Sequence, residues 1–200
     1  MRITRTRTSI LAVSAALTLG LAACSSNDPS TVSAPPAAGS SATEAVSAQH
    51  NDADITFIRD MTPHHVGALA MAQLAPTRAE NADVKALAAR IVAEQDPELN
   101  RMKEMATAWD VTLDAAGSMS MAPGSSMNMG GDEATLMPLK GAAFDRKFLE
   151  LMTAHHQGAL PMAQAQLDKG ENPQATVLAQ AIIKAQTAEI AEMKELLTQL

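Results

Sequence analysis

Two pairs of adjacent histidines, each accompanied by methionines, are the side chains of this 200-residue chain most suited to chemistry. The two sets have the same internal spacing and are Met61, His64, His65 and Met71, and Met152, His155, His156 and Met162. Imidazole nitrogen binds copper, zinc, iron and nickel, whereas thioether sulfur favours copper, especially Cu(I). The combination therefore predicts a metal-binding protein, with copper as the favoured ion.

The spacing within each set predicts that its members share one face of a helix. Residues three, four and seven positions apart lie on the same side of a helix, as Met61, His64, His65 and Ala68 do. Methionine at this spacing is also typical of a packed core, and that remains the alternative for each methionine taken singly. A repeated histidine pair on an apolar face, in a chain with five histidines in all, favours a role as ligand.

A second line of polar residues recurs downstream of each histidine pair. Its members are Gln95, Glu98 and Met102 in the first copy and Gln186, Glu189 and Met193 in the second. Buried polar groups need partners, and the histidines of a facing helix could supply them directly or through a bound ion. We therefore include Glu98, Met102, Glu189 and Met193 among the candidate ligands. Gln95 and Glu98 could instead orient the histidines without touching the metal, or belong to a structural hydrogen-bond network.

The two sets belong to an internal duplication. Shifting the sequence by 91 positions aligns Asp54 with Asp145, His64 with His155 and Asn81 with Asn172, and the alignment continues without a gap. The apolar residues of both copies recur with a helical period, and no stretch alternates as a strand would. Each copy is therefore predicted to form one helical hairpin.

Four helices are predicted, near 52–74, 82–108, 142–168 and 173–199. Asn81 and Asn172 are suited to cap the second and fourth helices, and Pro173 fits the first position after its cap. The fold is expected to be an all-α four-helix bundle made of two duplicated hairpins. Repeat 1 spans about 52–108, the connection 109–141 and repeat 2 about 142–199. Prolines inside three helices, Pro63, Pro97 and Pro161, are expected to kink them.

The connection between the repeats is rich in methionine. Met119, Met121, Met127 and Met129 lie among Ser, Gly, Pro and Asn, which is the composition of a loop. The Met-x-Met spacing favours a weak Cu(I)-binding loop. The alternatives are a patch that packs on the bundle and a low-complexity insert without a function.

The first two dozen residues have the pattern of an export signal. Arg2, Arg5 and Arg7 precede an apolar run that is shorter than the ~20 residues of a membrane-spanning helix. The following Leu-Ala-Ala-Cys resembles the lipobox of bacterial lipoproteins, which predicts a signal peptide over 1–23 and lipidation of Cys24. An ordinary cleavage site followed by an unrelated cysteine is the alternative.

Residues 24–49 are predicted to form a flexible, disordered tether, because they contain almost no large apolar side chain, and the folded domain is expected to span 50–200. The protein would then be exported and anchored by acyl chains to the outer face of the cytoplasmic membrane or elsewhere in the cell envelope.

The charge balance argues against a nucleic-acid partner. The formal net charge is −7, and it becomes −10 once Arg2, Arg5 and Arg7 are removed with the signal. No sequence feature predicts an organic cofactor. A metal ion is the expected partner.

The residues of both copies closely resemble those of the family of domains of unknown function numbered 305. The resemblance rests on Phe57-x-x-x-Met61-x-Pro63-His64-His65-x-x-Ala68-x-x-Met71-Ala72, followed by Ile91-x-x-x-Gln95-x-x-Glu98-Leu99-x-x-Met102, and covers most of 50–200. It implies a ferritin-like four-helix bundle, an exported location and an association with copper in some members. The second copy has Ala154 in place of Pro63, so the two sites are expected to differ in shape.

These patterns favour an exported protein that buffers or transfers copper without catalysis. The first alternative is a metal-free structural or interaction lipoprotein. A zinc or di-iron enzyme is less favoured, because the di-iron bundles use Glu-x-x-His and this sequence has none. A zinc hydrolase would need a general base, for which Glu98 and Glu189 are the candidates.

Overall fold

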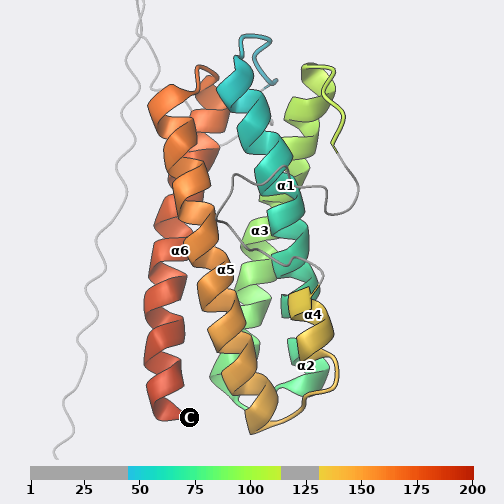
Figure 1. Ribbon diagram of the computed structural model, residues 1–200, viewed down its shortest axis with the longest axis vertical. Coiled ribbons are helices and arrows are strands. Elements are labelled where there is room, and N and C mark those ends of the chain that lie inside the picture. The colour runs from blue at the N-terminus through green and yellow to red at the C-terminus, as the bar shows by residue number, and fades with distance from the viewer. Residues whose placement is uncertain (1–44, 114–130) are drawn as a thin grey trace, which may run out of the picture. The chain divides into compact units, whose positions relative to one another are not determined.

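In the computed structural model, residues 45–113 and 131–200 are described, and six helices form within these two ranges (Figure 1). They are α1 (Asp52–Ala72), α2 (Ala75–Arg78), α3 (Ala82–Ala108), α4 (Gly131–Leu136), α5 (Ala142–Lys169) and α6 (Pro173–Gln199). The predicted all-α architecture is confirmed, since α1, α3, α5 and α6 are the four predicted helices. The short helices α2 and α4 were not predicted, and α1 ends two residues earlier than expected.

The helices begin where asparagine side chains can cap them. Asn81 accepts hydrogen bonds from the amides of Asp83 and Val84 at the start of α3, and Asn172 accepts one from Ala175 at the start of α6. Both caps were predicted, and Pro173 occupies the first turn of α6 as expected. Asn51 caps α1 in the same way, within a reciprocal capping box. Helices α1, α3 and α5 each continue through their internal proline.

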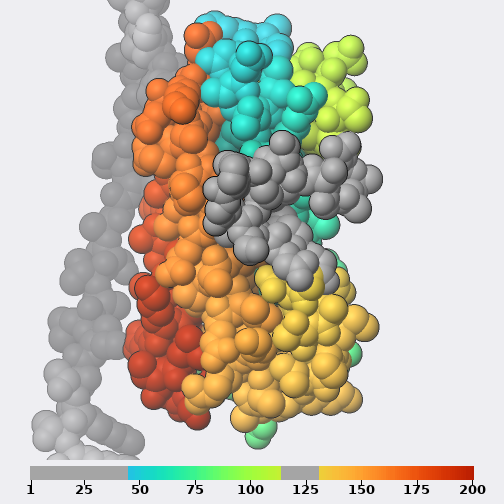
Figure 2. Space-filling view, in the orientation of Figure 1, coloured from blue at the N-terminus to red at the C-terminus, as the bar shows by residue number. Residues whose placement is uncertain are grey.

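The long helices pack as two hairpins, and the first helix of one hairpin packs against the first helix of the other. Helix α1 packs against α3, α5 packs against α6, and α1 and α5 lie side by side where the two repeats meet (Figure 1). In the space-filling view, the surface of α5 runs beside that of α6 along the bundle (Figure 2). The helices that carry the histidine pairs are therefore neighbours, so the two repeats can share one interior.

The apolar core consists of two clusters, one toward each end of the bundle. The Phe144 cluster includes Phe144, Phe148, Leu87, Ile91, Met71, Met152 and Met193. The Trp109 cluster includes Trp109, Phe57, Ile58, Leu99, Ile182, Met61 and Met102. Because neighbouring helices run in opposite directions, each cluster combines the first half of two long helices with the second half of the other two.

A layer of buried polar side chains separates the two clusters along all four long helices. We call it the histidine layer, and it consists of His64, His65, Gln95, Glu98, His155, His156, Gln186 and Glu189. Seven of these eight residues are buried and Glu98 is half-buried. The helical face predicted for His64 and His65, and for His155 and His156, is therefore the buried one.

Each repeat also caps the other through a buried aspartate. The Asp54 carboxylate accepts a hydrogen bond from the amide of Asn172 at 3.2 Å, and the Asp145 carboxylate accepts one from the amide of Asn81 at 2.8 Å. Burial raises the pKa of Asp54, but a hydrogen bond from Gln166 and three backbone amides outweigh it and lower that pKa. The aspartates thus fix the start of each second helix to the first helix of the other repeat.

Residues 45–50 lie against the end of the bundle that contains Trp109. The carbonyl of Ser47 accepts a hydrogen bond from the Trp109 indole at 2.9 Å, and that of Gln49 accepts one from the Asn172 side chain at 2.8 Å. The His50 ring stacks on Trp109 with centroids 4.8 Å apart. Residues 45–49 were predicted to belong to the flexible tether, and these contacts show that this part of the prediction is wrong. Their backbone carbonyls and the half-buried Val46 supply contacts that side-chain composition did not reveal.

Candidate metal centre

Two histidines of the layer are held by carboxylates from the facing helix of their own hairpin. The Nε2 of His65 lies 2.9 Å from Oε2 of Glu98, and the Nε2 of His156 lies 2.8 Å from Oε2 of Glu189. A carboxylate that accepts from Nε2–H leaves the lone pair on Nδ1. The Nδ1 atoms of both rings are buried without a hydrogen-bond partner. Each glutamate therefore contacts a histidine of the facing helix directly, which is one of the two arrangements that the sequence left open.

The other two histidines meet each other across the repeats. The rings of His64 and His155 have centroids 3.7 Å apart and are tilted by 45°. Both nitrogens of each ring are buried and lack a hydrogen-bond partner. One imidazole from each repeat thus lies at the point where α1 and α5 cross.

Burial keeps these two rings neutral at ordinary pH. Burial first, and then the charges of the nearby His156 and His65, lower the pKa of His155 to about 3. Burial likewise lowers the pKa of His64 well below its usual range, followed by the effect of His155. Neutral imidazole is the form that binds metals, so the environment holds both rings in the ligating state.

Unpaired polar atoms are concentrated in the histidine layer. Among the described residues, twelve buried side-chain nitrogen and oxygen atoms lack a hydrogen-bond partner, and all but Thr153 Oγ1 and Gln166 Oε1 belong to this layer. They include both side-chain polar atoms of Gln95 and Oε1 of Gln186. A buried polar group without a partner costs about 1–3 kcal/mol, so a ligand that binds these atoms would recover a substantial free energy.

Methionines lie on both sides of the layer. Met61 and Met102 belong to the Trp109 cluster, and the Thr62 hydroxyl donates to the Met102 sulfur at 3.8 Å. Met71, Met152 and Met193 belong to the Phe144 cluster, so a methionine of repeat 1 joins two from repeat 2. The methionines of the Phe144 cluster therefore come from both repeats, whereas Met61 and Met102 of the Trp109 cluster both come from repeat 1.

Met162 differs from its counterpart Met71. Met71 is 1% exposed, whereas Met162 is only partly buried, at the edge of the Trp109 cluster. Ala159 and Ala163, both fully buried, occupy the inner positions of that part of α5. The two sets of candidate ligands are therefore not equivalent.

Within residues 45–113 and 131–200, no group of three or more His, Cys, Asp or Glu side chains is arranged to hold a metal ion. The donors that the structure brings into one region are of two kinds: imidazole nitrogens in the layer, and thioether sulfurs in the clusters on either side.

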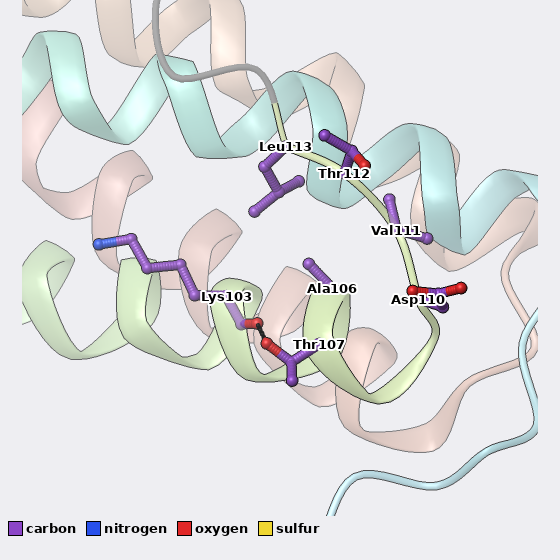
Figure 3. A pocket seen from close by; sticks show the side chains of 7 residues that line it. All are labelled: Lys103, Ala106, Thr107, Asp110, Val111, Thr112 and Leu113. Atoms are coloured by element: carbon purple, nitrogen blue, oxygen red, sulfur yellow. Dashed lines mark hydrogen bonds between the residues drawn. The ribbon is translucent and has the colours of Figure 1, made fainter.

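A surface hollow lies at the end of α3 and in the segment that follows it (Figure 3). It has a volume of about 340 Å³ and is lined by Lys103, Ala106, Thr107, Asp110, Val111, Thr112 and Leu113. The Thr107 hydroxyl donates to the Lys103 carbonyl at its edge. None of these lining residues is a predicted ligand, so the hollow is not the candidate centre.

Some predicted features lie outside the described residues. They are the lipidation site Cys24 and the loop methionines Met119, Met121, Met127 and Met129. Their roles remain predictions.

Two residues that matter for the site's architecture were not predicted to have a role. Asp54 and Asp145 are buried and join the repeats across the bundle. The signal was present in the spacing, because each precedes the first methionine of its set by seven residues and therefore lies on the same helical face. A carboxylate on an apolar face needs strong hydrogen-bond donors.

The fold and the site define a duplicated helical bundle with a buried histidine layer between methionine-containing clusters. The chain belongs to the DUF305 family, whose model, described as a domain of unknown function, matches residues 54–197. No curated protein matches the chain.

Solved structures of this family resemble the chain closely. A DUF305 fragment from Deinococcus radiodurans is 28% identical, with a TM-score of 0.65 over 75% of this chain and 98% of the fragment. CopM in its Cu(I)-bound form is 34% identical, with a TM-score of 0.62 over 73% of this chain and 96% of CopM. CopM also has Cu(II)-bound and Ag-bound structures.

A DUF305 protein from Streptomyces coelicolor, designated a secreted protein, is 28% identical with a TM-score of 0.64. It aligns with 74% of this chain and 91% of its own length. In the described part of the present chain, no helix combines the length and hydrophobicity that crossing a membrane requires.

Proposed function

We propose that the chain binds a soft metal cation, most favourably copper, at the histidine layer. The observation that carries this proposal is the set of buried imidazole nitrogens without partners: both nitrogens of His64 and His155, and Nδ1 of His65 and His156. A neutral imidazole has one nitrogen with a free lone pair, so a bound cation would accept one lone pair from each ring in place of a missing hydrogen bond.

The surroundings of the layer support a soft ion. Thioether sulfur lies in the apolar clusters on both sides, and sulfur together with imidazole favours copper, especially Cu(I). Glu98 and Glu189 support the same reading, because a carboxylate that receives the Nε2–H of a histidine orients the ring and increases the basicity of Nδ1. The copper-bound and silver-bound forms of CopM, which shares this fold, add to the argument.

The test is a competitive titration of the purified protein with Cu(I), Ag(I), Cu(II) and Zn(II), compared with the double variant His64→Leu/His155→Leu. Leucine removes the nitrogens but retains a buried side chain, so the fold is expected to survive, and circular dichroism checks this. We expect the parent to bind Cu(I) and Ag(I) more tightly than Zn(II), and the double variant to lose that binding.

His50→Ala is the matched control, because His50 is the chain's remaining histidine and stacks on Trp109 at the end of the bundle. It should bind as the parent does. Tight binding that survives in the folded double variant would contradict the proposal. The absence of binding to the parent would favour a metal-free structural role, and tighter binding of zinc with turnover would favour an enzyme.

We further propose that the protein works outside the cytoplasm, held to the membrane by acyl chains on Cys24. The argument rests on the signal pattern and on the secreted designation of the Streptomyces relative. Metabolic labelling with a palmitate analogue should mark the parent protein and spare Cys24→Ala. Equal labelling of both would contradict the anchor.

The methionine-rich segment is proposed as a second, weaker Cu(I) site. Replacing Met119, Met121, Met127 and Met129 with leucine should remove weak Cu(I) equivalents and leave the tight ones unchanged. Unchanged total stoichiometry would exclude this role.

A further inference from the structure

The histidine layer is least buried at its two glutamates, which lie on α3 and α6. The rings of His65 and His156 are completely buried, whereas the side chains of their partners Glu98 and Glu189 are 16% and 8% exposed. The His64, His155, Gln95 and Gln186 residues are at most 4% exposed. Glu98 is therefore the member of the layer that is most accessible from outside.

Carboxylates from both helices converge just outside the layer. The Arg90–Glu192 ion pair brings α3 and α6 together, and Glu94 follows Arg90 by one turn on α3 while Glu189 precedes Glu192 by one turn on α6. Glu94 also lies one turn before Glu98, so the three carboxylates share this side of the bundle; burial raises the pKa of Glu94, and the charges of Glu189 and Glu98 act in the same direction. Glu189 uses Oε2 to accept from His156, while its Oε1 is buried without a partner. A carboxylate oxygen that is buried, unpaired and beside two other acids favours the approach of a cation.

The same side of the bundle carries a surface groove of about 250 Å³ between α3 and α6. Its charged lining residues are Asp83, Arg90, Glu192 and Glu195, so acidic side chains outnumber basic ones there. Arg90 and Glu192 form an ion pair across the two helices, with side chains 47% and 40% exposed. Such exposed pairs contribute little to stability, so this contact can open without disturbing the fold.

The duplication provides an internal comparison for this arrangement. The 91-residue offset aligns Arg90 with Ala181 and Glu94 with Ala185, so the other half of the interface between α3 and α6 has alanine at both positions. Repeat 2 forms its hairpin with alanine at these two positions, so the hairpin requires neither Arg90 nor Glu94. The folding of the hairpin therefore does not explain why repeat 1 has Arg90 and Glu94 at these positions.

We propose that metal ions enter and leave the histidine layer between α3 and α6, past Glu94, and that the Arg90–Glu192 pair restricts this passage. The inference rests on the proposed metal-binding function. Glu94 attracts the cation to the carboxylates of Glu98 and Glu189, which adjoin the imidazoles. Arg90 opposes the cation by its charge and, while it is paired with Glu192, bridges the space between α3 and α6.

The test is the rate of metal exchange, measured by stopped-flow transfer of Cu(I) between a chromogenic chelator and the purified protein. Glu94→Gln should slow loading by about threefold or more at low salt, and the difference should shrink as ionic strength rises. Arg90→Gln should accelerate both loading and release. The two changes remove one charge each without shortening the side chain greatly, and neither Arg90 nor Glu94 is itself a proposed ligand.

Opposite effects from neighbouring positions separate this passage from a general loosening of the bundle, which would accelerate exchange in both variants. Ala185→Glu adds the missing carboxylate at the equivalent position, so combining it with Glu94→Gln should restore faster loading. Glu150→Gln, an exposed change on α5, is the matched control and should leave the rates unchanged.

The equilibrium stoichiometry of Cu(I) binding distinguishes a failure of the proposed passage from a failure of the proposed metal-binding function. The proposed passage is contradicted, and the metal site is not, if the variants bind as much Cu(I) as the parent but load within twofold of its rate. The same holds if the loading rates of both variants change in one direction. If the parent itself binds no Cu(I), Ag(I) or Cu(II), the proposed function fails and the passage fails with it.

Discussion

At the scale of single residues, the state of the two facing histidines has a consequence for stability. In the unfolded chain His64 and His155 take up protons near the ordinary histidine value of 6.5, whereas the folded-state pKa of His155 is about 3 and that of His64 is well below its usual range. Below pH 6.5 the unfolded state therefore binds more protons than the folded state. Folding stability must fall as the pH decreases through this range.

We accordingly expect the metal-free protein to lose about 2 kcal/mol of unfolding free energy per facing histidine between pH 6.5 and 5. Urea denaturation at several pH values measures this change. The folded His64→Leu/His155→Leu variant should show a much smaller loss over the same interval. An equally steep loss in the variant would show that other groups are responsible.

A second prediction at this scale concerns Glu98 and Glu189, the glutamates that are hydrogen-bonded to His65 and His156. Glu98→Gln and Glu189→Gln retain a hydrogen-bond acceptor for His65 and His156 but remove the negative charge. On the proposed function, each change should weaken Cu(I) binding about tenfold without altering stoichiometry, because the carboxylate increases the donor strength of the ring. Competition titrations measure the affinity, with the exposed Glu150→Gln as control. Unchanged affinity in both variants would leave the carboxylates with a structural role only.

At the scale of elements, the two asparagine caps allow equivalent substitutions in the two repeats to be compared. Asn81 and Asn172 each cap the second helix of a repeat, but the Asn172 side chain is fully buried and also donates to the carbonyls of Ser47 and Gln49. Asn81→Ala should cost about 1 kcal/mol, as the loss of an ordinary N-cap does. Asn172→Ala should cost about 2–3 kcal/mol, because buried groups of residues 45–50 lose their donor as well.

Urea denaturation compares the two variants, and Trp109 fluorescence adds a local readout because its indole donates to Ser47. Asn172→Ala should alter this fluorescence in the folded state, whereas Asn81→Ala should not. Equal destabilisation by the two substitutions would mean that residues 45–50 contribute little to the fold.

Much of this element-scale organisation could be predicted from the sequence. The helical period located α1, α3, α5 and α6, and the aligned asparagines located two caps. Periodicity identifies which face of a helix is buried but not which helix it meets, so the contact between His64 and His155 could not be predicted. The same limit hid the grouping of Met71 with Met152 and Met193, and the contacts of residues 45–50 depend on backbone carbonyls that composition does not reveal.

At the scale of the whole molecule, the reciprocal aspartates join the two repeats at both ends of the bundle. Asp54 binds the start of α6 at the end of the bundle that contains Trp109, and Asp145 binds the start of α3 at the opposite end. Each end of the bundle therefore contains a connection between repeats, and both apolar clusters draw on all four long helices. Neither hairpin has a core of its own.

This architecture predicts that damage at one end destabilises the other. Asp145→Ala removes a buried carboxylate that accepts from the amides of Glu80 and Asn81, and should cost about 3 kcal/mol. Trp109 lies in the other cluster, yet its fluorescence should report unfolding at the same lowered urea concentration as the helical circular dichroism signal, because the four helices separate together. If Trp109 kept the parent midpoint while part of the helical signal was lost earlier, the two ends would unfold independently. The histidine layer would then lie at a boundary between two folding units instead of inside one.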